Sequence, residues 1–206
     1  DIEMAQLAGA TRIFAPTVAD LYPNDFSTYV VPSGPLVERW EGWSRPHFFR
    51  GVCTIVCKLF QIIKPTLAIF GQKDFQQLQV VRKMVRDLDF QIEIHALPTV
   101  REEDGLAMSS RNTYLDSEER KVAPLLYQTL QQAAVIIQNN PKQNLEVLSQ
   151  NLASQLNAVP QIKIDYLSFV DAQSLQPVSQ FNGNVCLMVA AFVGNTRLID
   201  NLLNQT

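Results

Sequence analysis

Residues 66–77 read TLAIFGQKDFQQ. The run from 66 to 70 is short and continuous and ends at Gly71, as expected of a parallel strand covered on both faces. Beyond the polar loop that follows, apolar side chains recur at helical spacing and basic ones take the opposite face. The apolar positions are Leu78, Val81, Val85 and Leu88. A strand that leads through a loop into a helix is the beginning of a βαβ unit.

Neighbouring segments extend this unit in both directions. Residues 48–63 are almost entirely apolar and stop before Pro65, which predicts a buried helix. Residues 75–88 give the amphipathic helix, and residues 92–97 alternate as a strand does before Pro98. Helix, strand, helix and strand in this order predict an α/β fold with a doubly wound parallel sheet.

The first 31 residues carry shorter elements. Residues 12–15 predict a short strand, residues 18–21 a helical turn and residues 28–31 a further strand-forming segment. Residues 22–25 read YPND, a cluster of turn formers. The sequence begins at Asp1 rather than at a methionine and opens directly on these elements, so we expect it to start inside a longer protein.

The pattern changes after Pro98. Asp116 and Glu119 have capping-box spacing, which predicts a helical stretch from there to about residue 139, bent or broken in its first turns by Pro124. A second helix is expected over residues 145–156. We therefore expect a second domain in this part of the chain.

Two strand-like apolar runs complete that domain. They cover residues 162–170 and 185–193 and are separated by a loop that contains Asn182-Gly183. The expected division is residues 1–98 for the parallel sheet and residues 99–206 for a smaller α+β domain.

Composition limits the classes of function. The chain is 47% hydrophobic with a formal net charge of −3 and has no basic block, so neither nucleic acid nor a membrane surface is an expected partner. No run approaches the ~18 apolar residues of a membrane span, and no charged-then-apolar leader is present. The expected compartment is the cytosol.

The three cysteines, Cys53, Cys57 and Cys186, lie in apolar surroundings and form no Cys-x-x-Cys pair. A zinc site would be the alternative, but the two histidines, His47 and His95, are not at ligand spacing from a cysteine. We interpret the cysteines as reduced core residues and expect no metal-thiolate site.

The two commonest phosphate loops, Gly-x-Gly-x-x-Gly and Gly-x4-Gly-Lys-Ser/Thr, are absent from the sequence. The first candidate for a nucleotide site is therefore the loop at residues 71–77, because ligands of open α/β sheets bind at the carboxyl ends of strands. There Gly71 permits a tight turn, Lys73 can offer charge to phosphate, and Asp74 can cap the helix. Alternatively, Lys73 is a solvated lysine and Asp74 only an N-cap.

A second candidate covers residues 104–112, which read DGLAMSSRN. Arg111 could chelate phosphate oxygens, with Ser109 and Ser110 as further donors. The alternative is a surface pair between Arg111 and an aspartate on a capping loop.

A third candidate lies at residues 45–51, where arginines flank the expected start of a helix and could hold an anion. Because no acid or nucleophile is evident near His47, a capping or packing role is the favoured interpretation. His95 falls on a strand and is interpreted as structural. Gln76 and Gln77 cannot both face inward from one helix, so one of them should be solvated.

Five segments together resemble the pantothenate synthetase family, and they occur in that family's order and spacing from end to end of the chain. They are residues 14–16 (FAP) with 22–23 (YP), residues 45–46 (RP) with 49–52 (FRGV), residues 71–77 (GQKDFQQ), residues 104–112 (DGLAMSSRN) and residues 196–201 (TRLIDN).

The resemblance implies a partial Rossmann-like nucleotidyltransferase domain, a smaller lid-like C-terminal domain and a homodimer. It also implies an Mg²⁺-dependent reaction in which pantoate attacks the α-phosphate of ATP. The resulting pantoyl-adenylate then reacts with β-alanine to give pantothenate and AMP. Both steps need neutralised charge and aligned reactants more than a protein nucleophile.

The resemblance also implies roles for individual residues. The ATP site would consist of Gly71, Gln72, Lys73, Asp74, Val100, Met108, Ser109, Ser110 and Arg111. Among these, Lys73 would hold phosphate oxygens and Val100 would contact adenine, while Ser109, Ser110 and Arg111 would act catalytically with Lys73 as pyrophosphate leaves. Gln77 would bind pantoate.

Departures from the family's pattern leave other interpretations open. Gln72 replaces the family's usual glutamate, and His47 stands one place from the family's histidine. The family's Pro-Thr-Met-Gly, His-x-Gly-His and Asn-Pro-x-Gln-Phe segments lie upstream of these residues, so we expect the chain to lack the first strand and helix of the nucleotide fold. The alternatives are a non-catalytic remnant and another adenylyl- or cytidylyltransferase of the same fold.

Overall fold

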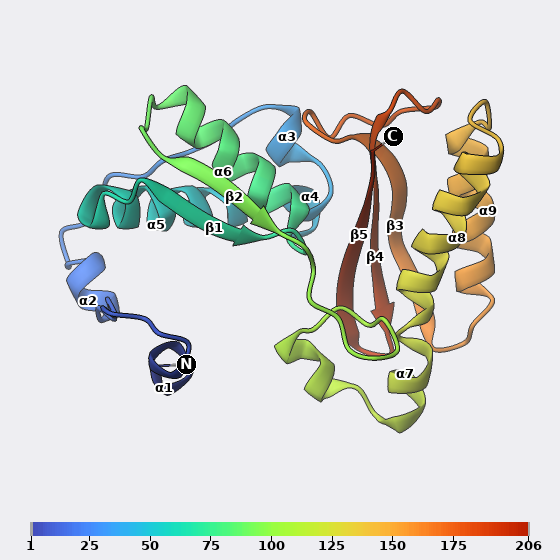
Figure 1. Ribbon diagram of the computed structural model, residues 1–206, viewed down its shortest axis with the longest axis horizontal. Helices are drawn as coiled ribbons and strands as arrows, with labels where there is room; N and C mark the ends of the chain where they lie inside the picture. The colour runs from blue at the N-terminus through green and yellow to red at the C-terminus, as the bar shows by residue number, and fades with distance from the viewer. Residues whose placement is uncertain (1, 206) are drawn as a thin grey trace.

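The computed structural model describes residues 2–205, and its βαβ unit forms as the sequence predicts (Figure 1). Strand β1 (Leu67–Gly71) leads into α6 (Phe75–Asp87), and β2 (Glu93–Leu97) pairs with β1 in parallel. Helix α5 (Phe48–Ile63) precedes them with the predicted bounds. These four elements are called the parallel half below.

The parallel half is covered on one side. Ala68 and Phe70 of β1 pack into a single apolar cluster with α5 and α6, whereas Leu67 and Ile69 are 41% and 58% exposed. Because both helices lie on the same face of the sheet, the expectation of a strand covered on both faces is wrong for the described residues. For the same reason α5 is buried along one face only, and its Ile62 is half exposed.

The N-terminal segment contains helices but no strand among its described residues. Helices α1 (Ile2–Leu7), α2 (Val18–Leu21), α3 (Pro35–Glu38) and α4 (Glu41–Ser44) are short. The helical turn at 18–21 and the turn that follows it are confirmed. The expected strand at 12–15 and the strand-forming segment at 28–31 are wrong, because neither finds a partner strand to pair with.

The second part of the chain builds a three-stranded antiparallel sheet, ordered β3-β4-β5, from β3 (Ile162–Asp171), β4 (Asn184–Val193) and β5 (Thr196–Gln205). One face of the sheet is packed by α8 (Leu125–Asn139) and α9 (Leu145–Asn157). These five elements are called the antiparallel half.

The local signals in this part are confirmed. Asp116 and Glu119 form a reciprocal capping box at the start of α7 (Ser117–Val122), and α8 starts directly after Pro124. Strand β5 was not predicted as a strand, because polar residues interrupt its apolar pattern. The Gly194-Asn195 pair between β4 and β5 is a hairpin signal that could have revealed it.

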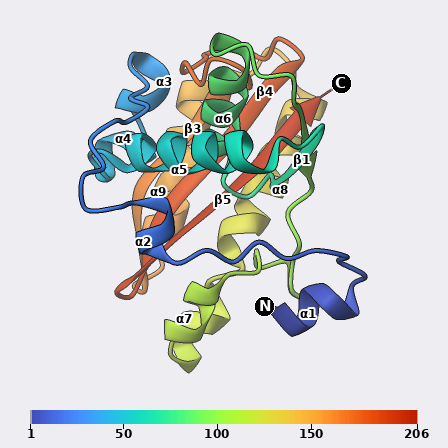
Figure 2. The same cartoon turned by 90° about the vertical axis from the view of Figure 1, so that its left-hand side faces the viewer.

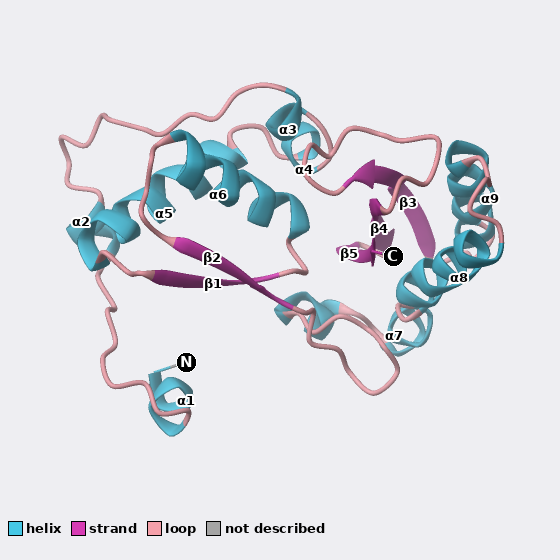
Figure 3. Cartoon of the chain, turned by 45° about the horizontal axis from the view of Figure 1, so that its top comes forward, coloured by secondary structure: helices cyan, strands magenta, loops and turns pink. Residues whose placement is uncertain are grey.

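The two halves pack against each other through a shared cluster. Phe75 and Leu78 of α6 contact Val170 of β3 and Met188 of β4. Figure 1 shows the parallel half on one side of the antiparallel sheet, and Figures 2 and 3 show the same arrangement from other directions, with α8 and α9 on the far side of that sheet in Figure 3. The domain division at residues 98 and 99 stays a prediction, and its outermost residues, Asp1 and Thr206, lie outside the described residues.

Gln76 joins the helices that lie between the two halves. Its side chain is buried, its Oε1 accepts from the Glu41 amide at 2.9 Å, and its Nε2 donates to the carbonyls of Leu36 at 2.7 Å and Arg39 at 3.0 Å. Three backbone groups of the α3–α4 segment therefore depend on one amide. Gln77, its neighbour, is half-buried, so Gln76 is the inward-facing member of the pair.

We expect Gln76→Ala to lower the free energy of unfolding by about 2–3 kcal/mol, because buried backbone groups would lose their partner. Urea unfolding followed by circular dichroism measures the change. Gln79→Ala is the matched control, since Gln79 is also buried on α6 and its side chain makes no hydrogen bond within residues 2–205. Its loss should be about 1 kcal/mol or less. Equal losses in the two variants would contradict the role of Gln76.

Candidate active site

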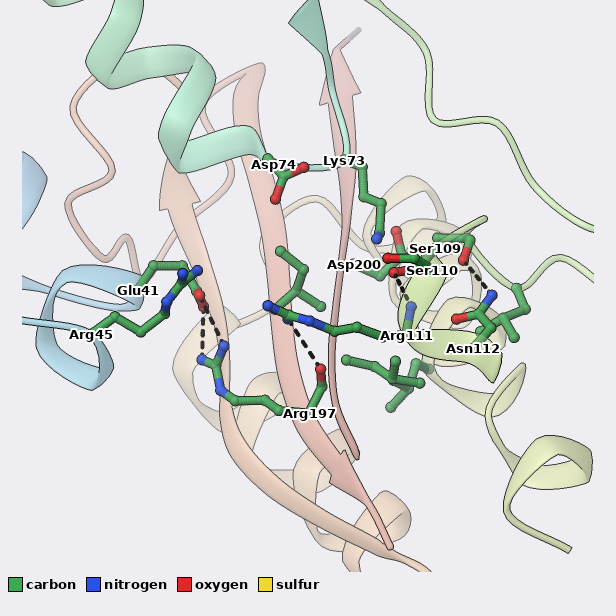
Figure 4. Close-up of a pocket in the computed structure, with 15 residues that line it drawn as sticks. Glu41, Arg45, Lys73, Asp74, Ser109, Ser110, Arg111, Asn112, Arg197 and Asp200 are labelled. Atoms are coloured by element: carbon green, nitrogen blue, oxygen red, sulfur yellow. Dashed lines mark hydrogen bonds and ion pairs between the residues drawn. The ribbon is translucent and has the colours of Figure 1, made fainter. Parts of the chain in front are cut away.

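A cavity of about 220 Å³ opens where the two halves meet (Figure 4). The α4 segment with Glu41 and Arg45, the loop before α6 and the loop at residues 106–112 all contribute to its lining. Strand β5 contributes residues 197–200. The polar residues that line it are Glu41, Arg45, Lys73, Asp74, Ser109, Ser110, Arg111, Asn112, Arg197 and Asp200. A smaller cavity of about 20 Å³ adjoins it and adds four polar residues, Gln76, Gln77, Tyr166 and Asn201.

Three cations of the larger cavity have no carboxylate partner among the ion pairs of the described residues: Arg45, Lys73 and Arg111. The Arg45 guanidinium lies over the Phe48 ring at 3.7 Å, and Arg111 makes a long hydrogen bond of 3.4 Å to the Arg197 carbonyl. Converging cations without counter-charges are suited to an anion with several negative oxygens.

The pKa of Lys73 is affected by the charges that surround it in the cavity. Burial lowers the pKa of its ammonium below the ordinary lysine value, the carboxylates of Asp74 and Asp200 oppose that effect, and the Arg111 cation adds to it. A bound anion would relieve both the desolvation and the repulsion from Arg111.

The fourth cation that lines the cavity is paired. Arg197 donates to both oxygens of Glu41, at 2.9 and 2.7 Å, and to Asp165 at 3.0 and 2.8 Å. Tyr166 donates its hydroxyl proton to Glu41 at 3.1 Å. Burial raises the pKa of Tyr166 and the Glu41 charge adds to this, so the phenol remains a donor. These four residues, called the junction network, tie α4 to the antiparallel sheet.

The loop that carries Ser109, Ser110 and Arg111 is held from both ends. At the first end, Arg101 forms a bidentate pair with buried Asp200, at 2.6 and 2.9 Å, and stacks on the Tyr127 ring at 3.5 Å. At the second end, Asn112 donates to Glu102 at 2.8 Å and to the Ala107 carbonyl at 3.1 Å.

Arg120 supports the same loop by bridging Glu102 and Asp104. Hydrogen bonds from Asn112 and Arg120 lower the pKa of Glu102, and the bond from Arg120 lowers that of Asp104. The alternative of a surface pair between Arg111 and Asp104 is wrong, because the partner of Asp104 is Arg120.

The structure brings together five of the residues named from the sequence, namely Lys73, Asp74, Ser109, Ser110 and Arg111. Gln77 lines the adjoining cavity. Four others lie outside the described lining of both cavities: Gly71, Gln72, Val100 and Met108. Asp74 occupies the N-cap position of α6, but its side chain makes no capping hydrogen bond. The expected cap is therefore wrong, and the carboxylate faces the cavity unengaged.

The histidines and cysteines lie away from this cavity. His47 precedes α5 with a left-handed backbone, φ 65°, and makes no capping hydrogen bond, so capping is not its role. His95 lies on β2, as predicted, and contacts Glu93 at 2.7 Å. Cys53, Cys57 and Cys186 are free thiols and two of them are buried; burial raises the pKa of Cys53 to about 11.

Sequence reasoning missed several residues of the site, and all of them except Asn112 are paired through contacts distant in the chain. They are Glu41, Asn112, Tyr166, Arg197, Asp200 and Asn201. Three of them stand in the TRLIDN segment, and the resemblance implies no role for any residue of that segment. Polar and apolar residues come in pairs in that segment and do not alternate, so its pattern alone does not indicate a strand with one face in a cavity.

Fold and site define the class of protein: an α/β enzyme fold whose two halves enclose a cleft lined by unpaired cations. Residues 1–203 match the family described as Pantoate-beta-alanine ligase, and the chain belongs to this family of ligases. The α/β class and the resemblance found from the motifs are thereby confirmed. The alternative of another adenylyl- or cytidylyltransferase family is set aside.

Named relatives agree with this assignment. Over 203 residues the chain is 46% identical to the pantothenate synthetase of Thermosipho melanesiensis and 49% identical to that of Thermotoga petrophila. The match covers 98% of this chain and 71% and 72% of those relatives.

Solved structures agree as well. A pantothenate synthetase from Thermus thermophilus superposes with a TM-score of 0.92 at 44% identity, over 100% of this chain and 75% of that one. A pantoate-beta-alanine ligase from Francisella tularensis, complexed with Beta-gamma ATP and Beta-alanine, gives 0.73 at 30% identity, over 98% and 68%. Within residues 2–205, no helix has both the length and the apolar character required to cross a membrane.

We expect Arg197→Met to lower the free energy of unfolding by about 3–5 kcal/mol, because the buried Glu41 carboxylate would lose its cation. Adding Glu41→Gln to Arg197→Met should restore part of this stability, since the buried charge is then removed as well. The control is Lys83→Met, which breaks an exposed pair with Asp87 and should cost under about 1 kcal/mol. Chemical denaturation of the four proteins compares them. A smaller loss for Arg197→Met than for Lys83→Met would refute the importance of the junction network.

The Arg120 bridge predicts a dependence of stability on pH. Because the folded pKa values of Glu102 and Asp104 lie below their ordinary values, the bridge stabilises the fold above those ordinary values and is lost as the pH falls through the folded ones. We expect Arg120→Met to lose less stability than the parent protein between about pH 6 and pH 3. The difference should be under about 1 kcal/mol because Asp104 is exposed and Glu102 is only half-buried. Identical pH profiles of urea unfolding would contradict this.

Proposed function

We propose that the protein condenses pantoate with β-alanine at the expense of ATP, by way of a pantoyl-adenylate. In the first step a pantoate carboxylate oxygen attacks the α-phosphorus of ATP, and the bond to the bridging oxygen breaks to release pyrophosphate. In the second step the β-alanine amine attacks the acyl carbon, AMP leaves, and the amine loses a proton. Family membership supports the overall ligation, and the Francisella complex with an ATP analogue and β-alanine supports these substrates.

The single observation that carries the ATP-dependent route is the group of three unpaired cations in one cavity, Arg45, Lys73 and Arg111. Negative charge moves onto the bridging oxygen as pyrophosphate departs, so cations already in place stabilise that transition more than the ground state. We assign Lys73 and Arg111 to the phosphate oxygens and Ser109 and Ser110 to additional hydrogen bonds.

The other site residues take supporting roles in this proposal. Gly71, Gln72 and Asp74 border the nucleotide at the start of α6, and Val100 and Met108, both exposed, are available for an adenine ring to cover. Gln77 binds pantoate from the adjoining cavity. Since Gln76 is engaged with the α3–α4 segment, Gln77 is the amide that remains for a ligand.

Mg²⁺ fits the cavity as a companion of ATP rather than as a resident metal. No group of three or more metal-ligating side chains occurs within residues 2–205. Mg²⁺ is often held by one or two carboxylates together with substrate phosphates. Asp74 is the lining carboxylate without a cation partner, because Glu41 and Asp200 are both paired with arginines. Bound there, Mg²⁺ would neutralise phosphate charge.

The oligomeric state rests on the resemblance alone, and the compartment on the hydropathy pattern of the sequence. We propose a homodimer that acts in the cytoplasm. Light scattering of the purified protein and fractionation of expressing cells test the two parts separately.

We expect Lys73→Ala to slow pantoate-dependent pyrophosphate release by about 100- to 1000-fold, the usual effect of removing one donor to a developing charge. Pantoate binding should change little, because the ammonium is assigned to phosphate. Coupled pyrophosphate detection gives the rate and calorimetry the pantoate affinity. An unchanged rate would refute the role of Lys73, and a parent protein that releases no pyrophosphate would instead support the non-catalytic alternative.

Gln77→Ala is the variant to compare with Lys73→Ala, because Gln77 lines the adjoining cavity and is assigned to pantoate rather than to ATP. It should weaken the binding of pantoate by about 1–3 kcal/mol, because a buried polar group of pantoate would lose its hydrogen-bond partner. The affinity for ATP should be nearly unchanged. Parallel weakening of both ligands would show that Gln77 is not specific for pantoate.

A further inference from the structure

Asn201 connects β5 to the loop that carries Lys73. Its side chain is 3% exposed, and its Nδ2 donates to the Gln72 carbonyl at 3.0 Å and to the Lys73 carbonyl at 2.8 Å. The other backbone hydrogen bonds described for residues 72–74 run from the Gln72 amide to the Leu97 carbonyl and from the Leu78 amide to the Asp74 carbonyl, both within the parallel half. The Asn201 amide is therefore the contact that fixes Lys73 to the antiparallel half.

The orientation of this amide is defined by its partners. Two carbonyl oxygens require a donor, so the nitrogen must face the loop. The Oδ1 atom points away and has no hydrogen-bond partner among the described residues. An aspartate at this position would keep the shape of the side chain but would place oxygen against both carbonyls.

The preceding residue holds the opposing loop. Asp200 accepts both hydrogen bonds of the Arg101 fork, and Arg101 also donates to the Gly105 carbonyl at 3.0 Å. Gly105 lies in the turn before Ser109. Two consecutive residues of β5 thus hold the backbone on the Lys73 side and the backbone on the Arg111 side of one cavity, whose labelled residues Figure 4 shows facing one another.

This arrangement matters because lysine is a point charge on a flexible stem. Its ammonium can meet a reacting phosphate reproducibly only when the main chain that carries it is fixed. We propose that Asn201 is a positioning residue of the ligase reaction, which sets the place of the Lys73 ammonium relative to Arg111 by holding the Gln72 and Lys73 carbonyls. The inference rests on the proposed function, in which Lys73 acts on the phosphates of ATP.

A double-mutant cycle tests the proposal. Asn201→Ala, Lys73→Ala and the double variant are compared with the parent protein in single-turnover pyrophosphate release at saturating ATP and pantoate. Asn201→Ala alone should slow release by about 100-fold, the effect of a small misplacement of a reacting group. In the Lys73→Ala background the same change should slow it by less than about twofold, because the residue that Asn201 positions is absent.

The outcomes separate the two claims. If Lys73→Ala retains the parent rate, the proposed role of Lys73 fails, and the positioning proposal fails with it. If Lys73→Ala is slow and the Asn201 effect multiplies fully in the double variant, Lys73 keeps its role and Asn201 acts on the fold in general, which overturns the positioning proposal. No effect of Asn201→Ala in the parent background also overturns it.

Two further variants distinguish a lost positioning contact from a general loss of folding. Asn201→Asp preserves the volume, and we expect it to slow release at least as much as Asn201→Ala with a Kd for ATP within about threefold of the parent value. It replaces Asn201→Ala in the cycle if the latter loses its near-UV circular dichroism. Asn204→Ala is the control on the same strand, since the Asn204 Nδ2 has no partner among the described residues. It should keep the parent rate, and a loss equal to that of Asn201→Ala would count against the proposal.

Discussion

The site depends first on the buried contact between Glu41 and Arg197, two residues 156 positions apart in the chain. Each is mostly shielded from water, so each charge would be unstable alone, and the pair is stable only while α4 and β5 remain together. Asp165 and the Tyr166 hydroxyl complete the hydrogen bonds of the pair. The position of one half against the other is therefore restricted by the requirement that neither charge loses its partner.

The pairing of charges divides the cavity into a fixed part and a part left for a ligand. Arg197 and Arg101 are held by Glu41 and Asp200 and serve as structure. Arg45, Lys73 and Arg111 remain without carboxylates in the described ion pairs, and burial together with the Arg111 charge lowers the pKa of Lys73. Under the proposed function, phosphate oxygens would supply the negative charge that this part of the cavity lacks.

Elements with local signals could be predicted from the sequence, and elements defined by a distant partner could not. The apolar runs at 48–63 and 66–70, the break at Pro124 and the capping box at Asp116 each have a cause within a few residues. Strand β5 has only the Gly194-Asn195 turn as a local signal, because its polar residues face a cavity built by segments far away and interrupt the apolar pattern. The strand expected at residues 12–15 is the converse case: its composition suits a sheet, but it has no neighbouring strand to pair with among the described residues.

The predictability of the site followed the same rule. Lys73 and the Ser109–Arg111 loop stand in recognisable motifs. The roles of Glu41 and Asn201 could not be predicted, because each depends on partners far away in the chain.

The same rule bears on which substitutions should damage the enzyme. The two loops that carry Lys73 and Arg111 keep their spacing through Asp200 and Asn201 on a single strand, and that strand keeps its place through Arg197. A β5 that slipped by one residue would turn all three of these side chains to other faces, since alternate residues of a strand point in opposite directions. Register between β4 and β5 is thus a requirement for the geometry of the cavity. It is set by the ten-residue pairing of these strands and the Gly194-Asn195 turn between them, so a turn outside the lining of the cavity helps to determine how the side chains of the cavity are placed.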